Sequence, residues 1–167
     1  GQVPPETQEY LELMRSRVER MESMINGLLE YARVGQTQVS LSTFSVEDLL
    51  AETLDSLSIP PSFRVELPSA LPMMTTNRLL LSQVFANLIG NAYKHHDRLD
   101  GRIEVTAAVQ GKMWEFSVAD DGPGIAAEDR DRVFAIFQTL GARDKPENTG
   151  IGLSIVKKII ESHDGNI

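Results

Sequence analysis

The chain has 167 residues, of which 41% are hydrophobic, so it can form one sizeable core with a helical extension. Its formal net charge of −8 argues against a nucleic-acid partner, because phosphate backbones are bound through basic faces. The sequence has no cysteine, no apolar run of membrane-spanning length and no signal-peptide pattern, which excludes disulfides and thiolate metal sites and predicts a cytoplasmic segment without membrane contact.

A first helix is predicted over residues 7–33. Apolar residues recur in it at alternating spacings of three and four, which is typical of helices packed lengthwise. This seam consists of Leu11, Met14, Val18, Met21, Ile25, Leu28 and Ala32. One seam cannot bury itself, so we favour packing on a second copy or on a helix outside this sequence over packing on the following domain. Gly35 and residues 36–44 are interpreted as a helix stop and a linker.

The next stretch alternates helix and strand signals. A helix is predicted over 45–58, with Ser45 as its N-cap and acidic residues in its first turn. Residues 63–67 alternate as a short strand, and 68–74 are predicted as a loop.

A mostly apolar helix is predicted over 77–95, and it carries three polar residues. Asn87 and Asn91 share one helical face, and Lys94 follows about one turn later. An amide oxygen such as that of Asn91 suits Mg²⁺, and the ammonium of Lys94 suits a phosphate. The alternative is that both asparagines are core residues bonded to the backbone. His95 and His96, at the end of the helix, are interpreted as structural.

Residues 102–109 and 113–119 predict a β-hairpin that leads into Val118-Ala-Asp-Asp-Gly-Pro-Gly-Ile125. Glycines in this motif allow a tight turn and close approach of a ligand. Asp120 is placed to accept a hydrogen bond from a group such as an adenine amino group. The alternative is an ordinary turn with solvated acids.

Three further segments follow. Residues 126–137 are predicted as a helix with an acidic start and an apolar end, and 138–148 as a mobile loop. Arg143 and Lys145 of that loop either reach phosphates or are simply solvated. Thr149-Gly-Ile-Gly-Leu153 then opens a helix that runs to about 162. A glycine-rich turn before a helix presents N–H groups to an anion.

Four segments in this order resemble the N, G1, F and G2 boxes of sensor histidine kinases. They are Asn87-Leu-Ile-Gly-Asn-Ala-Tyr-Lys94, Asp120-Asp-Gly-Pro-Gly-Ile125, Val133-Phe-Ala-Ile-Phe137 and Thr149-Gly-Ile-Gly-Leu153. Residues 1–35, with Leu28-Leu-Glu-Tyr-Ala-Arg-Val-Gly35, resemble the second helix of the family's dimerisation and phosphotransfer hairpin. The resemblance implies an α+β fold of the GHKL superfamily: a two-layer α/β sandwich over 45–167, the Bergerat ATP-binding fold, with helices on one face of a mixed sheet and a long amphipathic helix before it.

The resemblance also implies residue roles. Asp120 would bind the adenine amino group, Asn91 would hold Mg²⁺ with Asn87 beside it, and Lys94 would touch phosphate; these two asparagines and Lys94 form the implied catalytic set. Phe134 and Phe137 would anchor a lid. The implied nucleotide-binding residues are Asn91, Lys94, His95, Asp120, Gly122, Gly124, Ile125, Arg143, Lys145, Thr149, Gly150, Ile151, Gly152 and Leu153. The implied cofactors are ATP and Mg²⁺.

The sequence departs from the family in two respects. Asn148 stands where the G2 box usually begins with glycine. The acceptor motif, a histidine followed by an acid on the first helix of the hairpin, is absent, and the family continues beyond Ile167. We therefore expect a fragment that cannot phosphorylate itself. The expected partners are a second copy, through the N-terminal helix with the missing hairpin helix, and a response regulator receiver domain.

Three functions are compared on these grounds. The first is a kinase module that transfers the γ-phosphate of ATP to a histidine from another segment. The second is a GHKL-type ATPase, but such enzymes carry a water-activating glutamate where this chain has Asn87, and an amide cannot act as that base. The third is a non-catalytic module for nucleotide binding or dimerisation, an option that Asn148 keeps open.

Overall fold

A computed structural model describes residues 4–35, 40–139 and 149–167. The chain forms two compact units, one of Gly1–Thr37 with Ala127–Ile167 and the other of Gln38–Ala126. Within the described ranges, no helix combines the length and the apolarity that a membrane crossing requires.

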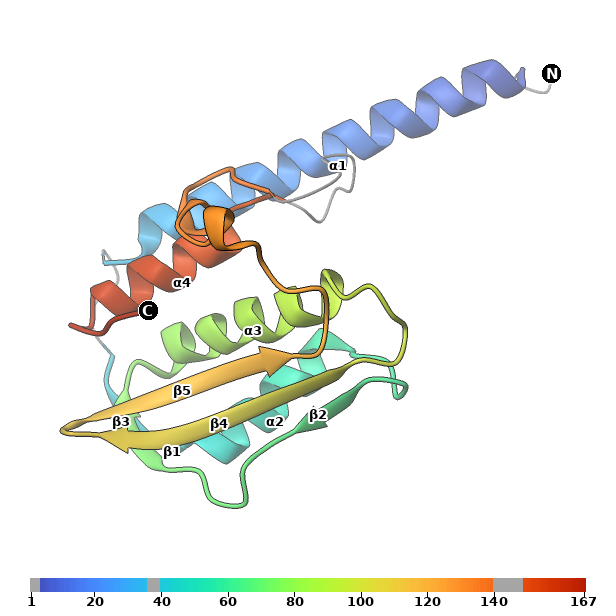
Figure 1. Ribbon diagram of the computed structural model, residues 1–167. Coiled ribbons are helices and arrows are strands. Elements are labelled where there is room, and N and C mark those ends of the chain that lie inside the picture. The colour runs from blue at the N-terminus through green and yellow to red at the C-terminus, as the bar shows by residue number, and fades with distance from the viewer. Residues whose placement is uncertain (1–3, 36–39, 140–148) are drawn as a thin grey trace. The chain divides into compact units, whose positions relative to one another are not determined.

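The first unit is built on two helices, α1 (Pro5–Arg33) and α4 (Gly152–Glu161), as Figure 1 shows. Proline is favoured in the first turn of a helix, and α1 begins at one. The two helices contact each other: a Cβ at Gly27 would lie 3.0 Å from Ile151 Cδ1, and Lys158 Nζ donates to the Tyr31 carbonyl at 2.7 Å. Both predicted helices are therefore confirmed.

The apolar seam of α1 lies on a different face from the contact with α4. Six of its members, Leu11, Met14, Val18, Met21, Ile25 and Leu28, are 46% to 64% exposed. The face toward α4 instead carries Gly27 and Tyr31. No described residue therefore covers the seam, although α1 does pack on its own unit.

The helix predicted over residues 126–137 is wrong. The structure has two short 3₁₀ helices there, η1 (Ala127–Asp129) and η2 (Arg132–Phe134). The chain turns extended at Ala135 and reaches a φ of +64° at Phe137, whose N–H donates to the Gly150 carbonyl at 2.9 Å. This bond to the segment before α4 requires the chain to leave a helical path, so tertiary contacts override the helical pattern.

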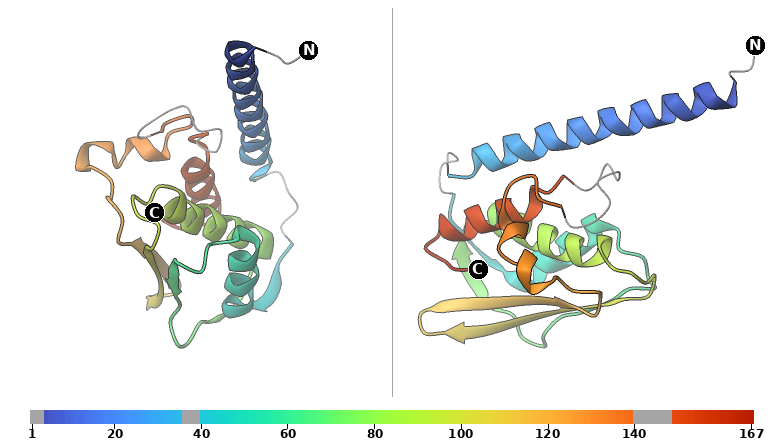
Figure 2. Two further views of the ribbon diagram at one scale, coloured as in Figure 1. Left: turned by 90° about the vertical axis from the view of Figure 1, so that its right-hand side faces the viewer. Right: turned by 45° about the horizontal axis from the view of Figure 1, so that its top comes forward.

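The second unit has a mixed sheet of β2 (Arg64–Glu66), β4 (Arg102–Gln110) and β5 (Met113–Asp120). The β2–β4 pair is parallel and the β4–β5 pair is antiparallel. Helices α2 (Val46–Leu57) and α3 (Arg78–Lys94) cover one face of this sheet (Figures 1 and 2). The predicted α+β class, with helices on one face of a mixed sheet, is confirmed.

The core of this unit lies between the hairpin and the two helices. Ile103 and Val105 of β4 are buried, as are Leu49 and Leu50 of α2 and Phe85 and Ile89 of α3, in one hydrophobic cluster. The register pairs Val105 with Val118 and Ala107 with Phe116, so the apolar residues predicted for each strand share a face.

Two short strands were missed in the sequence. Strand β1 (Ser42–Ser45) pairs antiparallel with β3 (Met73–Thr76), so the linker predicted to 44 and the loop predicted over 68–74 end too late. Four-residue strands are too short for a periodic signal, and this pairing is decided by contacts distant in sequence.

The helix caps agree with the sequence. Ser45 Oγ accepts the Asp48 N–H at 3.4 Å at the start of α2, as predicted. Asn77 Oδ1 does the same for the Leu80 N–H at 3.2 Å at the start of α3.

Asp121 joins three parts of the second unit. Its Oδ1 accepts the Arg102 N–H at 2.6 Å and faces His96 Nε2 at 3.0 Å, while its Oδ2 pairs with Arg98. The end of β5 is thereby bound to the start of β4 and to the segment after α3. The Arg102 N–H, followed by His96 and Arg98, holds the pKa of Asp121 well below its usual range, because these partners favour the carboxylate.

This pKa shift predicts a pH-dependent stability. A carboxyl whose pKa is lowered in the folded state stabilises the fold above its unfolded pKa of about 3.9, and that stability is lost as the pH falls toward the folded pKa. Asp121→Asn should therefore lower the free energy of unfolding more at about pH 6 than at about pH 3. Urea unfolding followed by the fluorescence of Trp114, the one tryptophan, measures this difference. Asp55→Asn on α2 is the control, and a loss from Asp121→Asn that is equal at both pH values would contradict the prediction.

Candidate functional site

The N-box residues lie along α3 and at its end. Asn87 and Asn91 are half-buried, and Lys94 and His95 are exposed. His95 is the C-cap, and its N–H donates to the Asn91 carbonyl at 3.0 Å. Asn87 Nδ2 donates to the Gln83 carbonyl at 2.9 Å, so its amide is held by its own helix, as in the alternative interpretation of the two asparagines.

The turn after β5 presents Asp120. Oδ1 of this residue accepts the Gly122 N–H at 2.9 Å, and the residue is exposed, so its carboxylate is both oriented and accessible to a donor. A Cβ at Gly122 would lie 2.7 Å from that oxygen and 3.2 Å from His96 Cδ2, so a side chain there would displace the Asp120 carboxylate. Gly124 has a φ of +70°, and Ile125 is 45% exposed.

The two groups of residues in the second unit meet at one end of it. His96, just beyond α3, contacts both Gly122 and Asp121 of the turn after β5. The structure thus brings the segment just after α3 beside the residues that follow Asp120.

The G2 segment belongs to the first unit. Gly150 has a φ of +67°, and a Cβ there would lie 2.5 Å from the Gln138 carbonyl oxygen, so no other residue fits without strain. Ile151 is buried, Thr149 and Leu153 are half-buried, and α4 begins at Gly152. No described side chain caps this helix, so its first N–H groups remain available to an anion.

The F-box residues lie against the G2 segment. The Phe134 ring is 5.9 Å from Lys157 Nζ of α4, and the Phe137 N–H bonds to Gly150. These contacts join the two ends of the predicted lid. Arg143 and Lys145, which were predicted to reach phosphates, lie outside the described residues. The predicted site is therefore divided between the units, with its N and G1 residues in one and its F and G2 residues in the other.

The donor set indicates how a metal would be held. Among the described residues there is no group of three or more His, Cys, Asp or Glu side chains placed to bind an ion. An all-protein cage is therefore missing from that part of the chain, while Asn91 offers a hard oxygen donor. Mg²⁺ is commonly held by one or two protein oxygens together with phosphate oxygens and water, so the residues present fit this ion.

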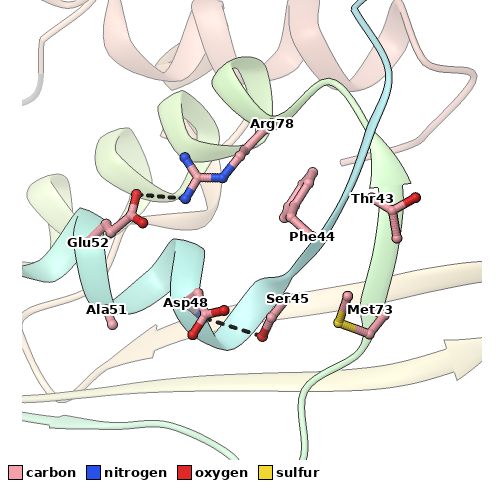
Figure 3. A pocket seen from close by; sticks show the side chains of 8 residues that line it. All are labelled: Thr43, Phe44, Ser45, Asp48, Ala51, Glu52, Met73 and Arg78. Carbon is pink, nitrogen blue, oxygen red and sulfur yellow. Dashed lines mark hydrogen bonds and ion pairs between the residues drawn. The ribbon is translucent and has the colours of Figure 1, made fainter.

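The second unit also has a surface hollow of about 600 Å³ between β1, α2 and β3 (Figure 3). It is lined by Thr43, Phe44, Ser45, Asp48, Ala51, Glu52, Met73 and Arg78. None of the predicted site residues lines it. Its arginine is paired with Glu52 at 2.6 Å, and the carboxylates on its wall do not suit a triphosphate.

Sequence reasoning missed the residues that support the Asp120 turn. The sequence predicts no role for Asp121 and only a structural one for His96, whereas the structure joins these two residues with Arg98 and Arg102. The available signal was the doubled acid at the end of a strand. One acid of such a pair faces a different way from the other, so the two need different partners.

Comparison with known proteins identifies the family. Residues 76–167 match the family described as histidine kinase-, DNA gyrase B-, and HSP90-like ATPase. The chain is 32% identical to the phytochrome-like protein Cph1 of Synechocystis and 33% identical to the sensor histidine kinase CpxA of Escherichia coli. These alignments cover 97% and 93% of this chain, but only 22% and 35% of those proteins.

A solved structure shows the same fold. Full-length ShkA in complex with AMPPNP superimposes with a TM-score of 0.70 at 28% identity, over 97% of this chain and 35% of that one. The family match over residues 76–167 includes both Asp120 and the G2 segment described above. The chain therefore belongs to the family of histidine kinase-, DNA gyrase B- and HSP90-like ATPases, in which it carries the ATP-binding catalytic domain of a sensor histidine kinase.

Proposed function

We propose that this chain binds ATP with Mg²⁺ and transfers the γ-phosphoryl group to a histidine supplied by another segment. The observation that carries the proposal is the exposed carboxylate of Asp120, oriented by the Gly122 N–H at the end of β5. Such an acceptor suits the amino group of adenine. Membership of the sensor kinase family and the AMPPNP-bound relative ShkA support it.

The other residues divide the work of holding the nucleotide. Asn91 offers an amide oxygen to Mg²⁺, and Lys94 offers an ammonium group to the phosphates. The uncapped N–H groups at the start of α4 suit the phosphates as well. When bound, ATP supplies the transferable γ-phosphoryl group and Mg²⁺ neutralises its charge. This chain orients the reactants and does not itself provide a nucleophile.

The composition of α3 favours transfer over hydrolysis. Asn87 occupies the place of the water-activating glutamate of the related ATPases, and its amide donates to the Gln83 carbonyl. An amide cannot take a proton from water, which disfavours hydrolysis and favours transfer to an imidazole of another segment. A response regulator receiver domain is the downstream partner that two-component signalling implies.

We also infer that residues 45–167 act as one ATP-binding domain, with residues 1–35 as a helix of the dimerisation hairpin. The family match over 76–167 includes residues of both compact units, which supports a single functional domain. Strand β1 enlarges this domain at its start, because its pairing with β3 places Ser42–Ser45 in the second unit.

Replacing the adenine acceptor tests the pocket. Asp120→Asn should weaken ATP binding by about 10- to 100-fold or more, because a charge-assisted hydrogen bond of about 1.5–3 kcal/mol is lost. Isothermal titration with a non-hydrolysable ATP analogue measures it. Glu115→Gln, at another exposed acid of β5, is the matched control and should bind normally. Unchanged affinity in Asp120→Asn would refute the pocket assignment.

A transfer assay tests the reaction. This chain is incubated with γ-labelled ATP, Mg²⁺ and a separate sensor-kinase hairpin that carries the histidine–acid motif. Label should appear on the hairpin, stable to base and labile to acid, and Asn91→Asp should reduce the labelling more than it reduces adenosine binding. Accumulation of free phosphate without labelled hairpin would instead favour hydrolysis.

We further propose that α1 forms a homodimer through its seam, together with the hairpin helix that the sequence lacks. The exposure of Leu11, Met14, Val18, Met21, Ile25 and Leu28 supports this, since a continuous apolar stripe is rarely left in water.

Light scattering tests this dimer. At high concentration we expect the mass of a dimer, and Met21→Glu should shift it toward a monomer because a charge would enter the apolar contact. Glu12→Gln, at an exposed position away from the seam, should have no effect. A monomeric mass for the unmodified chain would count against the proposal.

A further inference from the structure

The His96 side chain lies in the interior of the second unit. It has no exposed surface, although it follows the end of α3 by only two residues. Both ring nitrogens have partners: Nδ1 accepts the Arg98 N–H at 3.0 Å, and Nε2 faces Asp121 Oδ1 at 3.0 Å. An Nδ1 that accepts this N–H suits the tautomer in which Nε2 donates to the Asp121 carboxylate.

The ring is also fixed by packing. It meets Phe63 edge-on, with ring centroids 5.1 Å apart and planes at 88°. On another side, its Cδ2 lies 3.2 Å from the position that a Cβ of Gly122 would take. One imidazole therefore lies against the two residues that follow Asp120: it is hydrogen-bonded to Asp121 and it leaves no room for a side chain at Gly122.

The position of the Asp120 side chain depends on these two residues. It precedes Asp121 in the chain, and its Oδ1 accepts the Gly122 N–H at 2.9 Å. A shift of Asp121 or Gly122 would reorient the carboxylate that we propose to bind the adenine amino group. We infer that His96 is a positioning residue for adenine recognition, which acts on Asp120 through Asp121 and Gly122; this inference rests on the proposed nucleotide function.

Comparing the binding of two nucleotides distinguishes a positioning role of His96 from a purely structural one. ATP carries the 6-amino group of adenine, and purine riboside triphosphate lacks it, so only ATP binding depends on the orientation of Asp120. The readout is the ratio of their dissociation constants, measured on the whole chain with Mg²⁺. A general loss of structure would weaken the binding of both nucleotides, whereas a misplaced Asp120 would weaken the binding of ATP alone.

Two substitutions of His96 test the hydrogen bond itself. Asparagine keeps an acceptor near Nδ1 but is too short to reach Asp121, while glutamine can present an N–H close to the position of Nε2. His96→Asn should lower the preference for ATP about tenfold and leave the affinity for the purine analogue within about twofold. His96→Gln should retain most of the preference. His163→Asn, in the first unit, is the control and should change neither.

A second variant keeps the test decisive if His96→Asn does not fold. Asp121→Ala removes the partner of His96 and should cause the same loss of preference. Where both variants fold, the double variant should be no worse than Asp121→Ala alone, because that substitution already removes the bond to His96. Losses that add, an equal weakening of both nucleotides, or an unchanged preference would each overturn the inference. Failure of the unmodified chain to bind either nucleotide would instead refute the proposed function.

Discussion

Burial of one face of the β4–β5 hairpin under α2 and α3 is the interaction on which the second unit depends. Ile103 and Val105 of β4 pack in the cluster that includes Leu50 and Ile89. This packing fixes the position of both strands relative to the two helices. The end of β5 is then set beside the end of α3. The residues of the second unit that we propose to recognise a nucleotide are therefore positioned by a core that contains none of them.

Polar contacts refine what this core determines. Asp121 binds the Arg102 N–H and His96, and Asp120 is held by the Gly122 N–H. The Asp121 carboxylate is engaged with protein partners, while the Asp120 carboxylate is accessible to a ligand. Two adjacent carboxylates thus receive different tasks from their surroundings, as is common where binding sites are built at strand ends. In the first unit, the contact of Phe137 with Gly150 has the corresponding effect on the G2 segment.

Long elements with a strong hydrophobic pattern could be predicted from the sequence, because the spacing of their apolar residues indicates which face is buried. The helices α1, α2, α3 and α4 and the β4–β5 hairpin belong to this class, as do Ser45 as a cap and Asp120 at the end of β5. Residues 126–137 also look helical locally, but contacts with Gly150 and Lys157 decide their path. Strands β1 and β3 and the pairing of His96 with Asp121 depend on partners far along the chain, which one sequence pattern does not record.

The face of α1 that meets α4 is separate from its exposed seam, and this separation has a mechanical consequence. Two surfaces on different faces of one rod-like helix do not compete for space, so a neighbour along the seam leaves Gly27 and Tyr31 in place against Ile151 and Lys158. A rotation of the rod about its own axis moves both surfaces together. A partner bound to the seam that turned α1 would therefore also move the residues of α1 that contact Ile151 and Lys158.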